Sequence, residues 1–168
     1  VVLGDAGMGK TTLLEQIGKE VGFKFVNARR LVRAPNPSKL LGGATTFVID
    51  ALDELTLRNE GDAVDAVLGA LEKVGSPNFI LACRAADWRS ATSIQAVVDT
   101  YGNEPLELFL EPISSDEARE LLSREVGERR AQDVITHFEQ SGLEELFGNP
   151  QTLKLIIAVA REEDLPKS

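Results

Sequence analysis

The sequence has few residues that could cross-link the chain or bind metal ions: its 168 residues include one cysteine, Cys83, and one histidine, His137. A single cysteine cannot form a disulfide within the chain, and these two residues cannot supply the four ligands of a structural zinc site. No run of apolar residues approaches the roughly 18 that a membrane-spanning helix needs. The sequence therefore predicts neither a disulfide-stabilised scaffold nor a zinc domain nor a membrane span.

The sequence also lacks an excess of basic residues. It has 18 Lys and Arg against 27 Asp and Glu, a formal net charge of −9, which argues against nucleic-acid binding through overall charge. Hydrophobic residues make up 43%, enough for a packed core. The acidity is uneven, because residues 1–103 carry 11 basic and 12 acidic residues and residues 104–168 carry 7 and 15. Since Val1 is not a natural start, we interpret the chain as a piece of a longer protein.

The first part of the chain alternates short apolar runs with segments of helical periodicity, as in α/β proteins. The run Phe47-Val48-Ile49 has no polar interruption, which is typical of a strand buried on both faces. Strand and helix in alternation predict a parallel sheet of five strands flanked by helices. Strands are expected at 1–3, 23–26, 45–50, 79–83 and 106–110, and helices at 11–21 and 62–74.

The acidic second part has helical periodicity throughout. Ser114 and Glu117 form the pattern of a capping box, and Asn149-Pro150 resembles an N-cap followed by a first-turn proline. Helices are expected at 114–126, around 131–138 and from 150 onward. We therefore predict two domains, a core over residues 1–112 and a small helical subdomain over residues 113–168.

The strongest motif is a glycine-rich loop between the first expected strand and the first expected helix. It matches the phosphate-binding pattern G-x-x-x-x-G-K-S/T. Gly4 and Gly9 allow backbone angles and a close approach that a Cβ atom would block, while Lys10 supplies a charge for the β and γ phosphates and Thr11 a hydroxyl for Mg²⁺. The alternative is a glycine-rich turn with a chance lysine. The predicted nucleotide-binding residues here are Gly4, Asp5, Ala6, Gly7, Met8, Gly9, Lys10, Thr11 and Thr12.

Acidic residues follow the third expected strand. Asp50 ends this strand, and a carboxylate there can hold Mg²⁺ beside the phosphate loop. Asp53 and Glu54 follow, and either carboxylate could orient a water molecule against the γ phosphate as the base of hydrolysis. Spacing does not rank the two, and both could instead belong to a solvated turn.

The fourth expected strand is followed directly by Arg84. The carboxyl ends of parallel strands face the ligand crevice, so a cation there can contact the γ phosphate. The alternative is an ordinary surface arginine. We interpret Cys83 and Trp88 as packing residues and His137 as a surface or packing residue.

Together these residues resemble the nucleotide-binding module of the STAND family, which comprises signal-transducing P-loop ATPases related to AAA+ proteins. The run Asp50-Ala51-Leu52-Asp53-Glu54 is most similar to the NACHT branch, and residues 80–84 match as well. Residues 110–114 resemble the link into the helical lid, and Gly148-Asn149-Pro150 resembles the G-x-P motif of the family. The resemblance implies a P-loop NTPase that uses ATP or ADP and Mg²⁺. It assigns phosphate and magnesium to Lys10 and Thr11, magnesium to Asp50, hydrolysis to Asp53 and Glu54, the first sensor to Arg84, and contact with adenine to Pro150.

By this resemblance the chain is a slow cytoplasmic ATPase that switches the self-association of a larger signalling or defence protein with flanking effector and sensor domains. The segment that precedes the loop in the family and the winged helix that follows the lid are not in this sequence. A scaffold that binds ATP without hydrolysing it, a small-molecule kinase and a DNA-associated AAA+ ATPase are alternatives. The acidic second part offers DNA no phosphate-binding surface, and no guanine-reading motif is present, which favours adenine.

Overall fold

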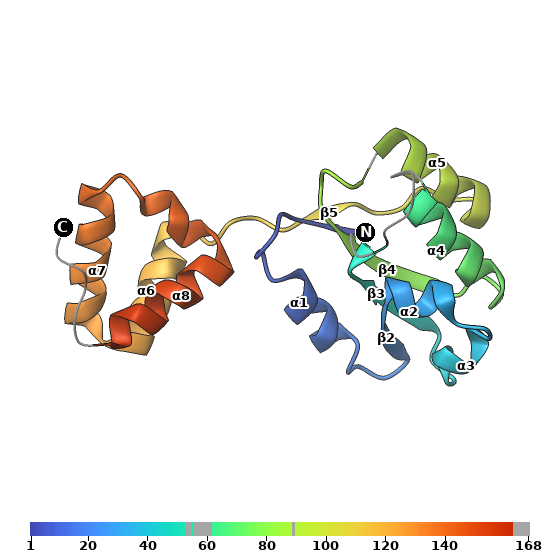
Figure 1. Ribbon diagram of the computed structural model, residues 1–168, viewed down its shortest axis with the longest axis horizontal. Helices are drawn as coiled ribbons and strands as arrows, with labels where there is room; N and C mark the ends of the chain where they lie inside the picture. Colours follow the sequence, from blue (N-terminus) through green and yellow to red (C-terminus); the bar gives the residue numbers. More distant parts are fainter. Residues whose placement is uncertain (53–54, 56–61, 89, 163–168) are drawn as a thin grey trace. The chain divides into compact units, whose positions relative to one another are not determined.

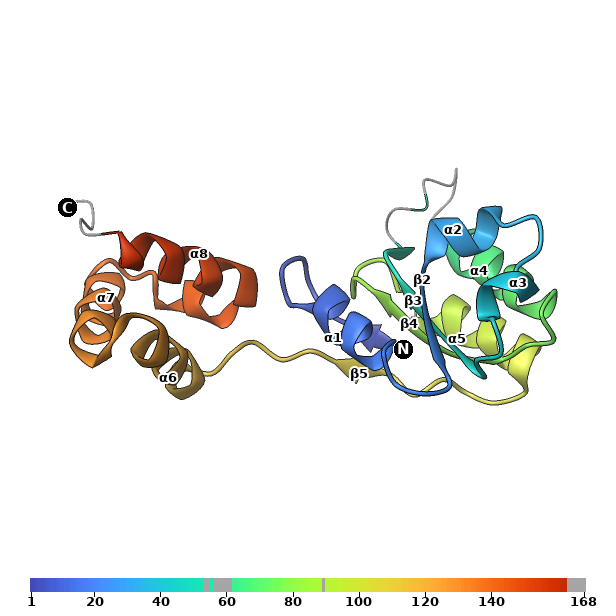
Figure 2. The same ribbon diagram turned by 90° about the horizontal axis from the view of Figure 1, so that it is seen from below.

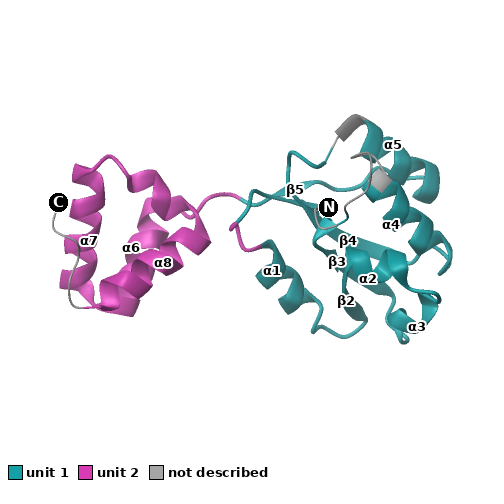
Figure 3. Ribbon diagram, in the orientation of Figure 1, with its two compact units in different colours: residues 1–6, 10–110 teal, residues 7–9, 111–168 magenta. Residues whose placement is uncertain are grey.

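The computed structural model describes residues 1–52, 55, 62–88 and 90–162. The chain divides into two compact units, shown in Figure 3. The first contains residues 1–6 and 10–110, and the second contains residues 7–9 and 111–168. Among the described residues, no helix has both the length and the apolar character needed to cross a bilayer.

The first unit contains an α/β sheet of five parallel strands in the order β2-β3-β4-β1-β5, which confirms the predicted parallel sheet (Figure 1). The first strand in the sequence lies between the fourth and the fifth: Val2 pairs with Ala82 and with Leu108. The strands are β1 (Val2–Leu3), β2 (Phe23–Asn27), β3 (Thr46–Asp50), β4 (Asn78–Cys83) and β5 (Leu108–Phe109).

The two faces of the sheet are covered by different helices. Because side chains alternate along a strand, Phe47 and Ile49 of β3 face one way and Val48 the other. Phe47 and Ile49 pack in a core with three helices, and Val48 packs against Leu14 of a fourth (Figure 2). The three are α2 (Ala28–Arg33), α4 (Asp62–Glu72) and α5 (Ser90–Tyr101), and the fourth is α1 (Lys10–Ile17). A short helix, α3 (Ser38–Leu41), precedes β3.

The first helix ends earlier than the periodicity predicts. It was expected to continue to Val21, but α1 stops at Ile17, and Val21 is 99% exposed. The reason lies at Gly18, where a Cβ atom would lie 2.6 Å from the Cβ of Phe25. The backbone can pass this close to β2 only without a side chain, so the chain turns there.

Four helical segments form the second unit around their own apolar core. Leu122, Val134, Phe147 and Leu153 are buried together, one from each segment. The predicted capping box is confirmed: the Glu117 N–H donates to Ser114 Oγ at 3.3 Å, and the Ser114 N–H donates to the Glu117 carboxylate at 2.9 Å. The Ser114 hydroxyl also donates to the Glu117 carboxylate, at 2.7 Å, and this hydrogen bond together with that from the Ser114 N–H holds the pKa of Glu117 below its usual value. The segments are α6 (Ser115–Val126), α7 (Glu128–Gln140), the 3₁₀ helix η2 (Glu144–Gly148) and α8 (Pro150–Arg161).

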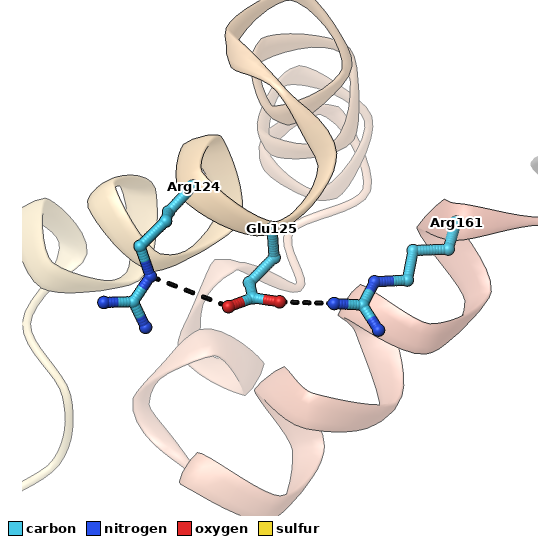
Figure 4. Close-up of polar contacts among 3 residues, drawn as sticks. All are labelled: Arg124, Glu125 and Arg161. Atoms are coloured by element: carbon cyan, nitrogen blue, oxygen red, sulfur yellow. Dashed lines mark hydrogen bonds and ion pairs between the residues drawn. The ribbon is translucent and has the colours of Figure 1, made fainter.

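Polar contacts connect the end of α8 to α6 and α7. The Glu125 carboxylate forms ion pairs with Arg124, at 3.6 Å, and with Arg161 (Figure 4). Arg130 donates to the carbonyl oxygens of Ala160 at 3.2 Å and Glu162 at 3.3 Å. The last carbonyl oxygens of a helix have no backbone N–H partner within the helix. Arg130 supplies donors to two such oxygens and so caps the carboxyl end of α8.

Candidate functional site

Three of the predicted site residues lie at the carboxyl edge of the sheet on adjacent strands. The order β3-β4-β1 places the end of β4 between the ends of the other two. Asp50 is the last residue of β3, Arg84 follows β4, and Gly4 follows β1, where its N–H donates to Cys83 O at 3.4 Å. Ligands of open parallel sheets bind outside this edge, so the structure brings the three together where such a ligand would lie.

Lys10 is held inside the predicted phosphate loop. Its Nζ atom donates to the carbonyl oxygens of Gly4 at 2.7 Å and Asp5 at 2.8 Å. Lys10 is also the first residue of α1, whose first backbone N–H groups have no partner within the helix. Thr11 and Thr12 follow in the first turn and are exposed. A positive charge and a helix amino end together are suited to an anion.

Two glycines of the loop have a positive φ, but only one of them is a glycine for which an unusual backbone angle was expected. Gly9 has a φ of 84°, as predicted, but the second positive φ, 80°, is at Gly7, and Gly4 has none. Residues Gly7–Gly9 belong to the second compact unit. Within that unit the Gln151 N–H donates to Gly7 O at 3.2 Å. The expectation of an unusual backbone angle at Gly4 is therefore wrong, because the first positive φ of the loop is at Gly7.

Asp50 is a buried carboxylate, 6% exposed. Within the described ranges no side chain or backbone group forms a hydrogen bond or ion pair with its carboxylate. A hard cation such as Mg²⁺ prefers carboxylate and hydroxyl oxygens as ligands. No group of three His, Cys, Asp or Glu gathers as a ligand set among the described residues. The Asp50 carboxylate and the Thr11 hydroxyl are therefore oxygen groups of the kind that bind Mg²⁺.

Ala51, directly after Asp50, has a φ of 59°. For a residue with a Cβ atom this left-handed conformation costs about 1–2 kcal/mol. Strained residues of this kind concentrate at functional sites, so the turn after Asp50 marks the same edge of the sheet independently of the motif. Sequence analysis missed Ala51, and no sequence signal reveals it, because alanine carries no preference for positive φ.

The loop after β4 begins at Arg84, which is exposed. Its carbonyl oxygen accepts from the N–H groups of Asp87 at 3.0 Å and Trp88 at 3.2 Å, which turns the chain back toward α5. Trp88 is buried and its indole N–H donates to the Glu107 carboxylate. Cys83 is also buried. Both are packing residues, as predicted.

The other predicted site residues lie outside the described part of the chain or in the second unit. Asp53 and Glu54 lie outside the described residues. Pro150 is the first residue of α8 in the second unit, where Asn149 Oδ1 caps the helix by accepting from the Gln151 N–H at 3.0 Å. His137 is half-buried with its ring against Phe138 at a centroid distance of 6.0 Å, which agrees with a packing role.

Comparison with known proteins adds no identification. No protein-family model matches the chain, and no curated protein matches it closely enough to be named as a relative. The function is therefore argued from the residues at the sheet edge.

We expect Gly9→Ala to destabilise the folded chain by about 1–2 kcal/mol, because alanine is strained at a φ of 84° although nothing lies within 4 Å of the added Cβ. Gly69→Ala is the matched control. Gly69 lies within α4, also with nothing within 4 Å, so alanine should stabilise it by about 0.5–1 kcal/mol. Urea unfolding measures both. Equal stability of the two variants would contradict a strained loop.

Proposed function

We propose that the chain binds Mg²⁺-ATP and hydrolyses it slowly, as the P-loop switch module of a larger protein of the STAND type, close to the NACHT branch. The observation that carries this proposal is the strand order. Three adjacent strands end in the phosphate loop, the buried acid Asp50 and the cation Arg84. A nucleotide triphosphate with its metal needs such a set: backbone donors, a carboxylate for Mg²⁺ and positive charge near the γ phosphate.

Each residue has a separate role in this proposal. The backbone N–H groups of residues 4–12 bind the phosphates, and Lys10 exchanges its carbonyl partners in the loop for β and γ phosphate oxygens. Thr11 and Asp50 hold Mg²⁺, whose positive charge offsets the charge that develops on the phosphates. Arg84 contacts the γ phosphate. Asp53 or Glu54 accepts the proton of the attacking water.

The second unit is proposed as the lid, with Pro150 as the residue that contacts the adenine. A proline suits this contact because its ring is apolar and it has no N–H to leave unpaired. We further propose that the nucleotide state controls the conformation and self-association of a cytoplasmic signalling or defence protein that carries effector and sensor domains.

The test is calorimetric titration with ATP, with and without Mg²⁺. We expect binding that Mg²⁺ strengthens, and Asp50→Asn should remove this enhancement because the amide carries no charge to bind the ion. Asp65→Asn is the control, since Asp65 is an exposed acid on α4. Binding of the wild-type chain that is indifferent to Mg²⁺, or no ATP binding at all, would contradict the proposal.

A further inference from the structure

One segment of this acidic chain has only basic charges. Residues 21–49 contain five Lys and Arg residues and no Asp or Glu, although the whole chain has a net charge of −9. Three of the five are arginines on the single helix α2: Arg29, Arg30 and Arg33. No role in the proposed nucleotide site uses them.

These arginines line a pocket in the first unit. Helix α2 buries Ala28 and Leu31 against the sheet, which leaves the three arginine side chains exposed. The pocket is open and has a volume of about 590 Å³. In the described part of the chain, none of the three guanidinium groups forms an ion pair or hydrogen bond. The pocket is lined by Asn27, Arg29, Arg30, Arg33 and the apolar residues Ala34, Pro35 and Leu40.

The second unit has a segment with the complementary chemistry. In the turn Leu143-Glu144-Glu145-Leu146, which includes the start of η2, both glutamates are exposed, and the leucines that flank them are 47% and 41% exposed. Phe147, the next residue, is buried in the core of the unit and anchors this turn. The described ion pairs of the second unit all involve Glu125, and among the described residues none joins Glu144 or Glu145 to a cation.

We propose that the arginine pocket of one copy of the chain binds the Leu143–Leu146 turn of a second copy. Arg29, Arg30 and Arg33 pair with Glu144 and Glu145, because the planar guanidinium group binds carboxylates through two donors at once. The exposed leucines Leu143 and Leu146 pack against Pro35 and Leu40.

The two surfaces of this contact differ, so each copy uses its pocket toward one neighbour and its turn toward another. Such head-to-tail contacts generate rings or filaments rather than closed pairs. The contact does not involve bound nucleotide, so its test is independent of the proposed ATPase activity. Exposed ion pairs are weak and screened within about 10 Å at 0.1 M salt, so association should depend strongly on protein and salt concentration.

The experiment is sedimentation velocity of the intact chain at low and high salt. We expect the wild type to associate at low salt and to dissociate at high salt. R30E/R33E and E144R/E145R should each weaken association by about tenfold or more, because attraction becomes repulsion. An equimolar mixture of the two variants should associate again, since each pocket then meets a turn of opposite charge, and so should the chain that carries all four substitutions.

Two control variants match the changes in net charge at exposed positions elsewhere: R129E/K154E and D133R/E139R. Both should associate like the wild type, and circular dichroism verifies that every variant is folded. A wild type that stays monomeric at low salt, or a mixture that fails to associate, would overturn the proposal. Binding of a heparin or oligonucleotide probe that requires Arg30 and Arg33, with a monomeric wild type, would assign the pocket to an external polyanion instead.

Discussion

Replacing Lys10 by alanine should weaken Mg²⁺-ATP binding by about a hundredfold, equivalent to about 2.7 kcal/mol. The Lys10 ammonium group is the only cation of the phosphate loop in the sequence, and hydrogen bonds between ions are stronger than those between neutral groups. In the structure it contacts Gly4 O and Asp5 O, which places it within the loop. Calorimetric titration of the variant with ATP measures the effect.

Lys19→Ala is the control for Lys10→Ala, because Lys19 is exposed just beyond the end of α1 and removes the same charge. Its affinity for ATP should equal that of the wild type. Thermal unfolding of Lys10→Ala separates lost binding from lost structure, since the variant also frees two carbonyl oxygens of the loop. An unchanged ATP affinity in a folded Lys10→Ala variant would refute the assignment of this loop.

Replacing the proposed catalytic base should lower the turnover of ATP about as strongly as Lys10→Ala lowers its binding, while leaving the binding itself almost unchanged. We expect Asp53→Ala or Glu54→Ala to lower kcat about a hundredfold while the affinity for ATP stays within a factor of about three. A general base acts chiefly in the transition state, so its removal reduces kcat rather than binding. Phosphate release measured at saturating ATP, with a parallel binding titration, distinguishes the two quantities.

Turnover is best measured both in dilute solution and under conditions that favour association, because a neighbouring copy could complete the site. Asp65→Ala serves as the matched control, an exposed acid on α4. If both base variants turn over ATP at the wild-type rate, the chain uses another base. If the wild type binds ATP and hydrolyses none, it is a scaffold that holds nucleotide.

The sequence was most informative where the residues of one element alone indicate its structure. Short apolar runs predicted the strands, and Ser114 with Glu117 predicted the start of α6 correctly. Three helices of the first unit were missed: α2, α3 and α5. Helix α2 has six residues, three of them arginine, which is too short for periodicity to register. Helix α5 does carry apolar residues at helical spacing, at Ile94, Val97, Val98 and Tyr101, and this signal could have revealed it.

The candidate site was predictable in its parts and not in its assembly. Motif spacing singled out Lys10 and Asp50 as candidate site residues, but the strand order that places β4 between their strands depends on pairing between distant segments. The positive φ of Ala51 and the early end of α1 also depend on tertiary contacts of the backbone with distant parts of the chain. Such contacts leave no local pattern in the sequence.

The position of β1 within the sheet has a consequence for how the chain folds. This strand precedes the other four in the sequence, yet its two partners are residues 82–83 and 108–109. Pairing over such sequence separations is slow, because the closure of long loops precedes the contacts that stabilise them. The strand that leads into the phosphate loop is therefore among the last to be fixed. During synthesis the loop should acquire its shape only after β5 has emerged, so the proposed nucleotide would bind, and stabilise, only a first unit that is already complete.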